Sequence, residues 1–344
     1  MLISDYDYDL PPELIAQKPL AERSASRMLL VDRASATFDD HQFTDLPGFL
    51  RAGDLLVLNN TKVFPARLMG RTPTGATVEI FLVRETADRT WVTLARPARR
   101  LQPGKTIDFA GKLSAEVIGK LEDGSVTVRF DRSADFYNIL DEIGRTPLPP
   151  YIKRDKLPAI DADREVYQTV FATSRGAIAA PTAGLHFTAE VLDAVRAVGV
   201  ITTYITLHVG YGTFEPVRVD DLKDHRVSPE SYEISMEAAE ILREAKTDNR
   251  RIIAVGTTTT RALESNLADH KRFHPGSHIA ELTITPGYKF KAVDALLTNF
   301  HLPRSSLLVL TSTFGGRELI MRAYRHAVGQ RYRFYSYGDC MLIT

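Results

Sequence analysis

Residues 63 to 130 differ in rhythm from the rest of the chain, and this contrast constrains the fold most strongly. Short β-rich runs follow one another there, separated by turn signals such as Thr72-Pro-Thr-Gly75. Several runs, Val126–Phe130 among them, alternate apolar and polar residues. Strands with turns about every 8–12 residues are typical of a small antiparallel barrel or sandwich. We therefore expect a β-barrel domain over residues 63–150, closed by the stiff segment Pro147-Leu-Pro-Pro150. The predicted strands are Val63–Arg71, Thr77–Arg84, Thr90–Arg96, Thr106–Phe109, Leu113–Ile118 and Ser125–Phe130.

After residue 151 the pattern changes to strands and helices in alternation, which indicates a layered α/β domain. The segment before the barrel carries its own apolar strand, Asp54–Leu58. We therefore expect an α/β domain built from residues 1–62 and 151–344, with the antiparallel β-barrel inserted into it. The predicted helices are Thr188–Val198, Ser235–Thr247, Thr258–Leu267 and Glu318–Val328, and the predicted strands are Val200–Leu207, Arg251–Val255, Leu307–Thr311, Tyr332–Tyr335 and Met341–Ile343.

Composition narrows the class of protein. The 344 residues are 44% hydrophobic and 25% charged, as in globular chains long enough for two domains. Lys plus Arg and Asp plus Glu are both 43, which argues against a protein that coats nucleic acid non-specifically. The N-terminus is acidic where a signal peptide is basic, so we expect a cytosolic protein without membrane association. The single cysteine, Cys340, excludes an intrachain disulfide and a cysteine-rich metal site.

Four polar blocks in the second half of the chain lie at the edges of apolar runs. Each combines Gly or Pro with Thr, His, Arg or Asn, the composition of loops that present polar groups from strand ends. We expect these loops to serve one pocket. The blocks are Ala180–Phe187, Leu207–Phe214, Val255–Ser265 and Leu297–Pro303.

Two of these blocks contain glycines that favour a ligand close to the backbone. Gly210-Tyr-Gly212 lacks the third glycine of a dinucleotide-binding loop, so it indicates a ligand loop or an ordinary turn. Val255-Gly256-Thr257-Thr258 stands between a strand and a helix, where backbone N–H groups suit an anion or a polar ligand edge, with simple capping as the alternative. Arg261 and Glu264 are three residues apart, a spacing that also fits a surface ion pair.

Histidines near the loops are acid–base candidates, because imidazole exchanges protons near neutral pH. His186, His208, His225 and His301 all qualify, although any one of them could instead be structural. His270, His274 and His278 have the four-residue spacing of metal ligands on a helix. Pro275-Gly276 breaks that helix, so we expect no metal site.

At these residues the chain resembles the S-adenosylmethionine:tRNA ribosyltransferase-isomerase family of queuosine biosynthesis. The resemblance spans nearly the whole length, from Asp9–Gln17 through Leu148–Ile152 to Tyr332–Asp339. Its most specific segments are Pro181–Phe187 and Thr298–Pro303. After Asp224-His225 the family usually has a second histidine where this chain has Ser228-Pro229, so a role for that histidine does not transfer.

The resemblance implies transfer and isomerisation of the ribosyl moiety of S-adenosylmethionine. The acceptor would be 7-aminomethyl-7-deazaguanine at the tRNA wobble position, and the products epoxyqueuosine in tRNA, adenine and methionine. S-adenosylmethionine would be a co-substrate, and no further cofactor or metal is expected. A monomer is expected.

Site roles follow as expectations from the blocks and from the chemistry. We expect His186, His208 and His301 to transfer protons. The residues expected to hold S-adenosylmethionine are Thr182, Gly184, Gly210, Gly212, Thr213, Gly256, Thr257, Thr258, Arg261 and Asn299. The residues expected to contact tRNA are Asn59, Asn60, Arg67, Arg322 and Arg325.

Two other functions compete with this interpretation. An ordinary S-adenosylmethionine methyltransferase predicts a Gly-rich strand–helix turn near the start of an α/β domain, and none is evident in the sequence. A non-catalytic RNA-binding module would use the barrel through exposed aromatics and a basic groove. That alternative leaves the polar blocks of residues 180–303 unexplained.

Overall fold

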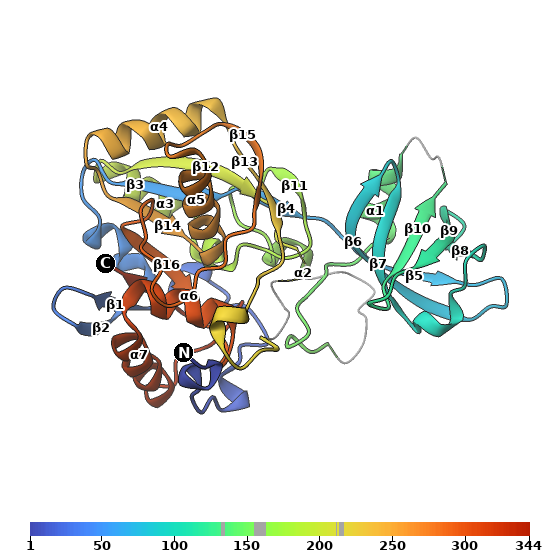
Figure 1. Cartoon of the computed structure of the whole chain (residues 1–344), viewed down its shortest axis with the longest axis horizontal. Helices are drawn as coiled ribbons and strands as arrows, with labels where there is room; N and C mark the ends of the chain where they lie inside the picture. Colours follow the sequence, from blue (N-terminus) through green and yellow to red (C-terminus); the bar gives the residue numbers. More distant parts are fainter. Residues whose placement is uncertain (132–134, 155–162, 211, 213–216) are drawn as a thin grey trace.

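The computed structural model describes residues 1–131, 135–154, 163–210, 212 and 217–344. Figure 1 shows two parts along the long axis of the molecule, with a β-barrel at one end and a large sheet with its helices at the other. Both termini lie in the part that contains the large sheet. Among the described residues, no helix is both long and apolar enough to span a membrane.

A nine-stranded mixed sheet forms the centre of the larger part, in the order β15-β13-β12-β3-β14-β16-β17-β1-β2. The neighbours β12, β3, β14 and β16 run parallel, so their carboxyl ends meet at one edge. β1, β2 and β3 come from before the barrel and the other strands from after it, which confirms a sheet built from both ends of the chain. The strands are β1 Arg27–Asp32, β2 Thr37–Gln42, β3 Leu55–Asn59, β12 Ile201–Leu207, β13 Glu230–Ile234, β14 Ile252–Val255, β15 Gly276–Ala280, β16 Ala295–Asn299 and β17 Cys340–Ile343.

Helices cover both faces of this sheet because its central strands are apolar on both sides. In β3, Leu55 and Val57 pack into a core shared with α4, α5, α6 and α7, whereas Leu56 and Leu58 pack into a core shared with α3. This is the period-two alternation of a strand buried on both faces. The helices of this part are α2 Asp163–Val166, α3 Ala189–Ala197, α4 Met236–Thr247, α5 Thr257–His270, α6 Ser306–Gly315 and α7 Arg317–Gly329.

The smaller part is a closed antiparallel barrel with the order β10-β7-β6-β5-β8-β9, as predicted from the turn spacing. Its interior is filled by fully buried apolar side chains such as Ile80, Ile107 and Val117. The helix α1 Phe136–Ile143 packs its Phe136 and Leu140 into the same core. The barrel strands are β5 Arg67–Arg71, β6 Thr77–Ala87, β7 Thr90–Arg96, β8 Thr106–Phe109, β9 Leu113–Lys120 and β10 Val126–Phe130.

The chain enters and leaves the barrel through a short parallel pair, β4 Thr61–Val63 and β11 Ser174–Ala177. The predicted strand Val63–Arg71 is therefore wrong as a single element, since it is divided between β4 and β5. Pro65 lies at the division, where its missing N–H interrupts a ladder. The domain limits at residues 63 and 150 stay a prediction.

Two strands predicted near the C-terminus are wrong. Leu307–Thr311 lies inside helix α6, which begins after Ser305 because the Ser305 hydroxyl accepts a hydrogen bond from the backbone N–H of Leu308 at 3.2 Å. A short apolar run has the same pattern in a buried helix as in a buried strand. Tyr332–Tyr335 is a loop, and its residue Phe334 pairs with Ile15 through an isolated β-bridge.

A pair of glycine substitutions tests the packing inside the barrel. A Cβ added at Gly70 in β5 would lie 2.4 Å from Ile107 Cγ2 and 2.8 Å from Phe109 Cε1, whereas one added at Gly119 in β9 would meet nothing within 4 Å. We expect Gly70→Ala to lower the free energy of unfolding by about 1–3 kcal/mol through overpacking. The control Gly119→Ala is expected to change it little. Urea denaturation followed by Trp91 fluorescence measures both, and equal stabilities would contradict this packing.

Candidate functional site

Two adjoining cavities lie at the carboxyl edge of the parallel strands, and all four polar blocks contribute to their walls. The first, of about 60 Å³, is lined by residues of each block, among them Pro181, Val209, Gly256 and Asn299. The second, of about 150 Å³, includes Gly212, Arg261 and Pro303 and shares Thr257, Thr258, Leu307 and Tyr335 with the first. We call the two cavities together the edge pocket. Crevices outside the carboxyl ends of parallel strands are the usual ligand sites of open α/β sheets.

The start of helix α5 forms one wall of the edge pocket. Gly256 has φ +94°, a left-handed conformation that glycine adopts at no steric cost and that turns the chain from β14 into the helix. Thr259 and Thr260 bond their hydroxyls back to the carbonyls of Val255 and Gly256. Thr257 and Thr258 line both cavities at the positive end of the helix dipole. This wall therefore suits a carboxylate or a polar ligand edge.

Three tyrosines that the sequence interpretation did not identify form an aromatic wall in the same cavity as the start of α5. Tyr151, Tyr167 and Tyr335 line the first cavity, and Tyr335 lines the second as well. The rings of Tyr151 and Tyr335 meet edge to face with centroids 3.8 Å apart. Tyr335 has φ +74°, a backbone strain that clusters at ligand sites. Because these tyrosines come from distant segments with no shared spacing, no local pattern could have grouped them.

His186 is buried beside the edge pocket with both ring nitrogens engaged. Its Nδ1 lies 2.7 Å from the Ser26 hydroxyl and its Nε2 lies 3.2 Å from Asn299 Oδ1. The Asn299 Nδ2 donates to the Tyr335 carbonyl at 2.9 Å, which turns Oδ1 toward the histidine. Nε2–H therefore donates to Asn299, and Nδ1 accepts from Ser26. Burial lowers the pKa of His186 to about 4, so this ring is neutral at pH 7.

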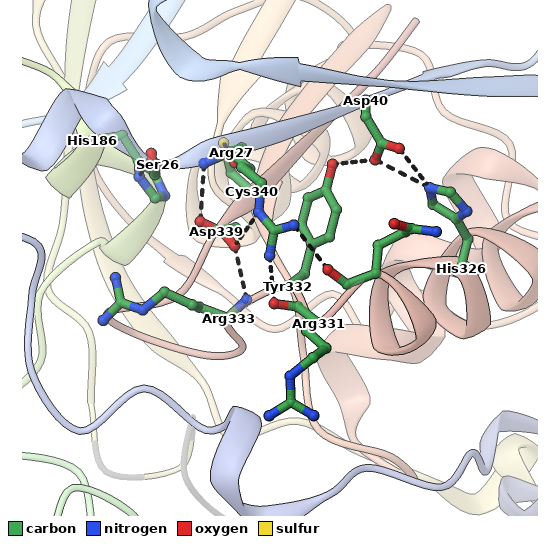
Figure 2. Close-up of polar contacts among 11 residues, drawn as sticks. Ser26, Arg27, Asp40, His186, His326, Arg331, Tyr332, Arg333, Asp339 and Cys340 are labelled. Atoms are coloured by element: carbon green, nitrogen blue, oxygen red, sulfur yellow. Dashed lines mark hydrogen bonds and ion pairs between the residues drawn. The ribbon is translucent and has the colours of Figure 1, made fainter.

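A further cavity is lined by His186 itself together with Arg23, Ser26, Arg333 and Ser336. Asp339 fixes its geometry, since its carboxylate accepts hydrogen bonds from the backbone N–H groups of Arg27 at 2.9 Å and Arg333 at 2.8 Å (Figure 2). Ser336 also lines the first cavity of the edge pocket. The turn before β17 thus connects the two cavities, a role that the sequence alone did not indicate.

His208 follows β12 and lies near the small β4–β11 pair. Its Nδ1 is 2.8 Å from the Thr61 hydroxyl, and its ring covers Gly176, where an added Cβ would lie 2.6 Å from the ring. Burial lowers its pKa, although the side chain is only half-buried. His208 is not among the described residues that line the edge pocket, but its neighbour Val209 is.

His301 lines the first cavity but is tightly held by the fold. Its Nε2 lies 2.9 Å from the Thr298 hydroxyl, and its backbone N–H donates to the Tyr324 hydroxyl at 3.0 Å. Burial lowers the pKa of His301 to about 3, so this ring is also neutral at pH 7.

Arg261 forms a buried ion pair with Glu230, not with Glu264. Arg261 Nη1 lies 2.8 Å from Glu230 Oε2, and Nη2 donates to the carbonyls of Ser228 and Ala280 at 2.8 and 2.6 Å. Glu230 Oε1 accepts from the Gly210 N–H at 3.0 Å. The Arg261–Glu264 pair weighed from the spacing is therefore wrong.

Glu264 instead accepts hydrogen bonds from the Tyr288 hydroxyl at 2.9 Å and from the backbone N–H groups of residues 291 to 293. Helical spacing placed Arg261 and Glu264 on one face of α5, but it did not predict that each of them pairs with residues of another segment.

The remaining residues expected to bind S-adenosylmethionine fall into three groups. Thr182 lines the first cavity. Gly184 is a close-packing position, because an added Cβ would lie 2.8 Å from Thr169. Gly212 lines the second cavity, and Thr213 lies outside the described residues.

The residues expected to contact tRNA are spread over the molecule. Asn59 is buried, and its amide bonds the backbone of Thr61 and Leu207. Asn60 accepts from the Thr206 hydroxyl at 2.7 Å. Arg67 lies at the barrel entrance, 3.4 Å from Glu79. Arg322 and Arg325 are exposed on α7, far from the barrel (Figure 1). A role in tRNA binding stays a prediction for all five.

The lowered pKa values of His186 and His301 predict acid sensitivity of the fold. Each pKa lies below the usual histidine value of about 6.5, at about 4 and about 3, so the unfolded state binds protons first as the pH falls. We expect the stability to be complete above about pH 6.5 and to decline toward pH 4, by up to about 1.4 kcal/mol per pH unit for each histidine.

Urea midpoints measured between pH 7.5 and 4.5 test this, with His301→Asn expected to flatten the slope. His41→Asn is the control, since His41 is a partly exposed residue 3.9 Å from Asp45. Identical slopes in wild type and His301→Asn would show that His301 does not carry this effect.

Comparisons with known proteins agree with this architecture. The family model described as queuosine biosynthesis protein matches residues 3–343. Proteins named S-adenosylmethionine:tRNA ribosyltransferase-isomerase are 48% identical in Syntrophotalea carbinolica and 49% identical in Symbiobacterium thermophilum, each over all of both chains. The crystal structure of S-adenosylmethionine tRNA ribosyltransferase from Thermotoga maritima is 36% identical, with a TM-score of 0.57 over 99% of this chain and 100% of that one. The matched segments include the barrel, the mixed sheet and the four blocks of the edge pocket, and the chain belongs to the queuosine biosynthesis protein family.

Proposed function

We propose that this protein is an S-adenosylmethionine:tRNA ribosyltransferase-isomerase. It would transfer and isomerise the ribosyl moiety of S-adenosylmethionine onto 7-aminomethyl-7-deazaguanine at the tRNA wobble position, giving epoxyqueuosine-tRNA and releasing adenine and methionine. The observation that carries the proposal is the edge pocket, in which all four polar blocks meet at the carboxyl ends of parallel strands. The names of full-length relatives at 48% and 49% identity support it.

The two walls of the edge pocket match the two ends of S-adenosylmethionine. The carboxylate of the methionyl group would accept hydrogen bonds from the first N–H groups of α5 and from the hydroxyls of Thr257 and Thr258. The adenine ring and the cationic sulfonium would lie against Tyr151 and Tyr335, because aromatic faces attract both π-systems and cations. No additional cofactor or metal takes part in this proposal.

Arg261 lines the second cavity, and we propose that it shapes the wall of that cavity through its ion pair and hydrogen bonds. Its described hydrogen bonds go to Glu230 and to the carbonyls of Ser228, Ala280 and Leu282. Glu230 in turn holds the N–H of Gly210, so the ion pair fixes the start of the Gly210–Gly212 loop against the pocket. Asn299 similarly links His186 to the aromatic wall through Tyr335.

The reaction needs a base for the carbon beside the sulfonium and a donor for the departing adenine. We propose that His208 exchanges protons from the rim of the edge pocket, since its ring is half-buried, Thr61 anchors its Nδ1 and its neighbour Val209 lines the first cavity. His186 holds both ring nitrogens in hydrogen bonds and is proposed to position Asn299. His301 lines the pocket as a neutral group and is proposed to contact the ligand.

The tRNA would reach the edge pocket from the side of the barrel. The wobble base must leave its stack, because its reactive amine is otherwise out of reach. We propose that the anticodon arm lies between the barrel and the α/β part, near Asn60 and Arg67, while Arg322 and Arg325 contact phosphates farther along the tRNA. The barrel aromatics Trp91, Phe109 and Phe130 are buried, so they do not form the exposed stacking surface of an RNA-binding barrel. A cytosolic monomer remains the proposed state.

The reaction is tested with purified protein, S-adenosylmethionine and tRNA that carries 7-aminomethyl-7-deazaguanine. We expect equal release of adenine and methionine, with the ribosyl mass gained by the tRNA, as followed by mass spectrometry. Release of S-adenosylhomocysteine would instead identify a methyltransferase. Binding of tRNA without either set of products would favour an RNA-binding module.

The same assay under single-turnover conditions separates the histidines. We expect His208→Ala to slow adenine release by about 10²–10⁴-fold, the usual contribution of a general acid or base. His41→Ala, remote from the edge pocket on β2, is expected to retain the wild-type rate. A wild-type rate in His208→Ala would remove His208 from the proton transfers, and the same criterion applies to His186→Ala and His301→Ala.

A further inference from the structure

We propose that His270, His274 and His278 form a binding site for a late first-row divalent cation such as Zn²⁺. His270 ends helix α5, His274 lies in the loop that follows, and His278 lies in strand β15. The sequence interpretation assumed that the helix break at Pro275-Gly276 separates the three rings. The chain instead turns back at this break and brings the three rings together.

The nitrogen positions suit a tetrahedral ion. One ring nitrogen of each histidine lies within 4.8 Å of the others. The Nε2 of His270 and the Nδ1 of His278 are 3.3 Å apart. With zinc–nitrogen bonds of about 2.0–2.1 Å, neighbouring ligands of a tetrahedral ion are about 3.3–3.4 Å apart. Two of the ligands are therefore at the required separation, and the third has to move by no more than about 1.5 Å.

The tautomer of His278 is fixed in the form that binds metal. Its Nε2 lies 3.3 Å from the Pro275 carbonyl, which accepts hydrogen bonds only, so Nε2 carries the proton. In the neutral ring Nδ1 then presents its lone pair toward His270. A hydrogen bond from the second ring nitrogen to a backbone carbonyl is the usual outer-sphere support of a metal-bound histidine.

The loop that carries His274 is held by a buried amide. Asn266 is fully buried, its Oδ1 accepts from the His274 N–H at 2.8 Å, and its Nδ2 donates to the His274 carbonyl at 3.0 Å. These bonds fix the backbone of His274 while leaving its exposed side chain able to rotate toward the ion. Three neutral imidazoles without a thiolate suit Zn²⁺, Ni²⁺ or Cu²⁺.

A cation at this site would join the end of α5 to β15, the edge strand of the sheet. The same two segments meet at the edge pocket, where Arg261 of α5 donates to the carbonyls of Ala280 and Leu282 that end and follow β15. The site is thus a structural clamp, with a solvent molecule as fourth ligand, on the unit that carries the Arg261–Glu230 pair. It does not depend on the proposed reaction.

The test uses the full-length chain without a histidine tag, stripped of metal by a chelator and titrated with Zn²⁺ by calorimetry. We expect one saturable site per chain that includes these histidines. At a free concentration about 100 times the dissociation constant, the unfolding midpoint should rise by roughly 4 °C. The variants His274→Ala and His278→Ala should weaken binding at least about tenfold. His41→Ala serves as the matched control.

Substitution with Co²⁺ gives a readout that does not depend on stability. A tetrahedral Co²⁺ complex absorbs strongly in the visible range, and this absorption should appear in the wild type and disappear in His274→Ala. Because His274 is exposed, this variant is expected to keep the metal-free unfolding midpoint of the wild type. The proposal is overturned if the wild type shows no saturable binding, if the Co²⁺ spectrum is octahedral, or if both histidine variants bind Zn²⁺ as the wild type does.

Discussion

The parallel register of β12, β3, β14 and β16 is the constraint on which the site depends. Backbone pairing sets Ile205 against Asn59 and Val255 against Leu297, so the strands end close together. Each strand has polar residues at its end or within two residues of it (Asn60, His208, Thr257 and Asn299), and the shared direction of the strands brings those residues to one edge. An antiparallel arrangement of the same strands would send alternate blocks to opposite edges of the sheet. The edge pocket is therefore a consequence of topology before it is one of side-chain chemistry.

Burial at this edge creates a second requirement, since buried polar groups need partners. Asn59 satisfies the backbone of Leu207, Asn299 connects His186 with Tyr335, and Glu230 neutralises Arg261. Through these bonds, Asn299 and Arg261, which were expected to bind the ligand, hold neighbouring parts of the pocket in place. Removing one partner of a buried ion pair such as Arg261–Glu230 leaves the other charge uncompensated and costs about 3–5 kcal/mol of stability. A substitution at either residue therefore affects the stability of the fold as well as the function.

The sequence predicted much of the fold because its signals are local. Turn residues and period-two alternation fix the barrel strands, and caps such as Thr188 and Ser235, whose hydroxyls accept from backbone N–H groups, fix helix starts. The strand prediction for Leu307–Thr311 failed because an apolar run of this length fits a buried helix and a buried strand equally well. The partner of Arg261 was also out of reach, since Glu230 lies 31 residues away in sequence.

The sequence by itself determined the α/β class, the inserted barrel, the four polar blocks and the family resemblance, because composition, turn chemistry and motif order are properties of neighbouring residues. Only the tertiary structure decided which of those groups touch. It placed Tyr151 and Tyr335 in one cavity with the start of α5, bound His186 to Ser26, and brought three histidines together where helix α5 ends. The reason is physical: contacts between distant segments are set by strand order and packing, and the spacing of residues along the chain carries no record of either.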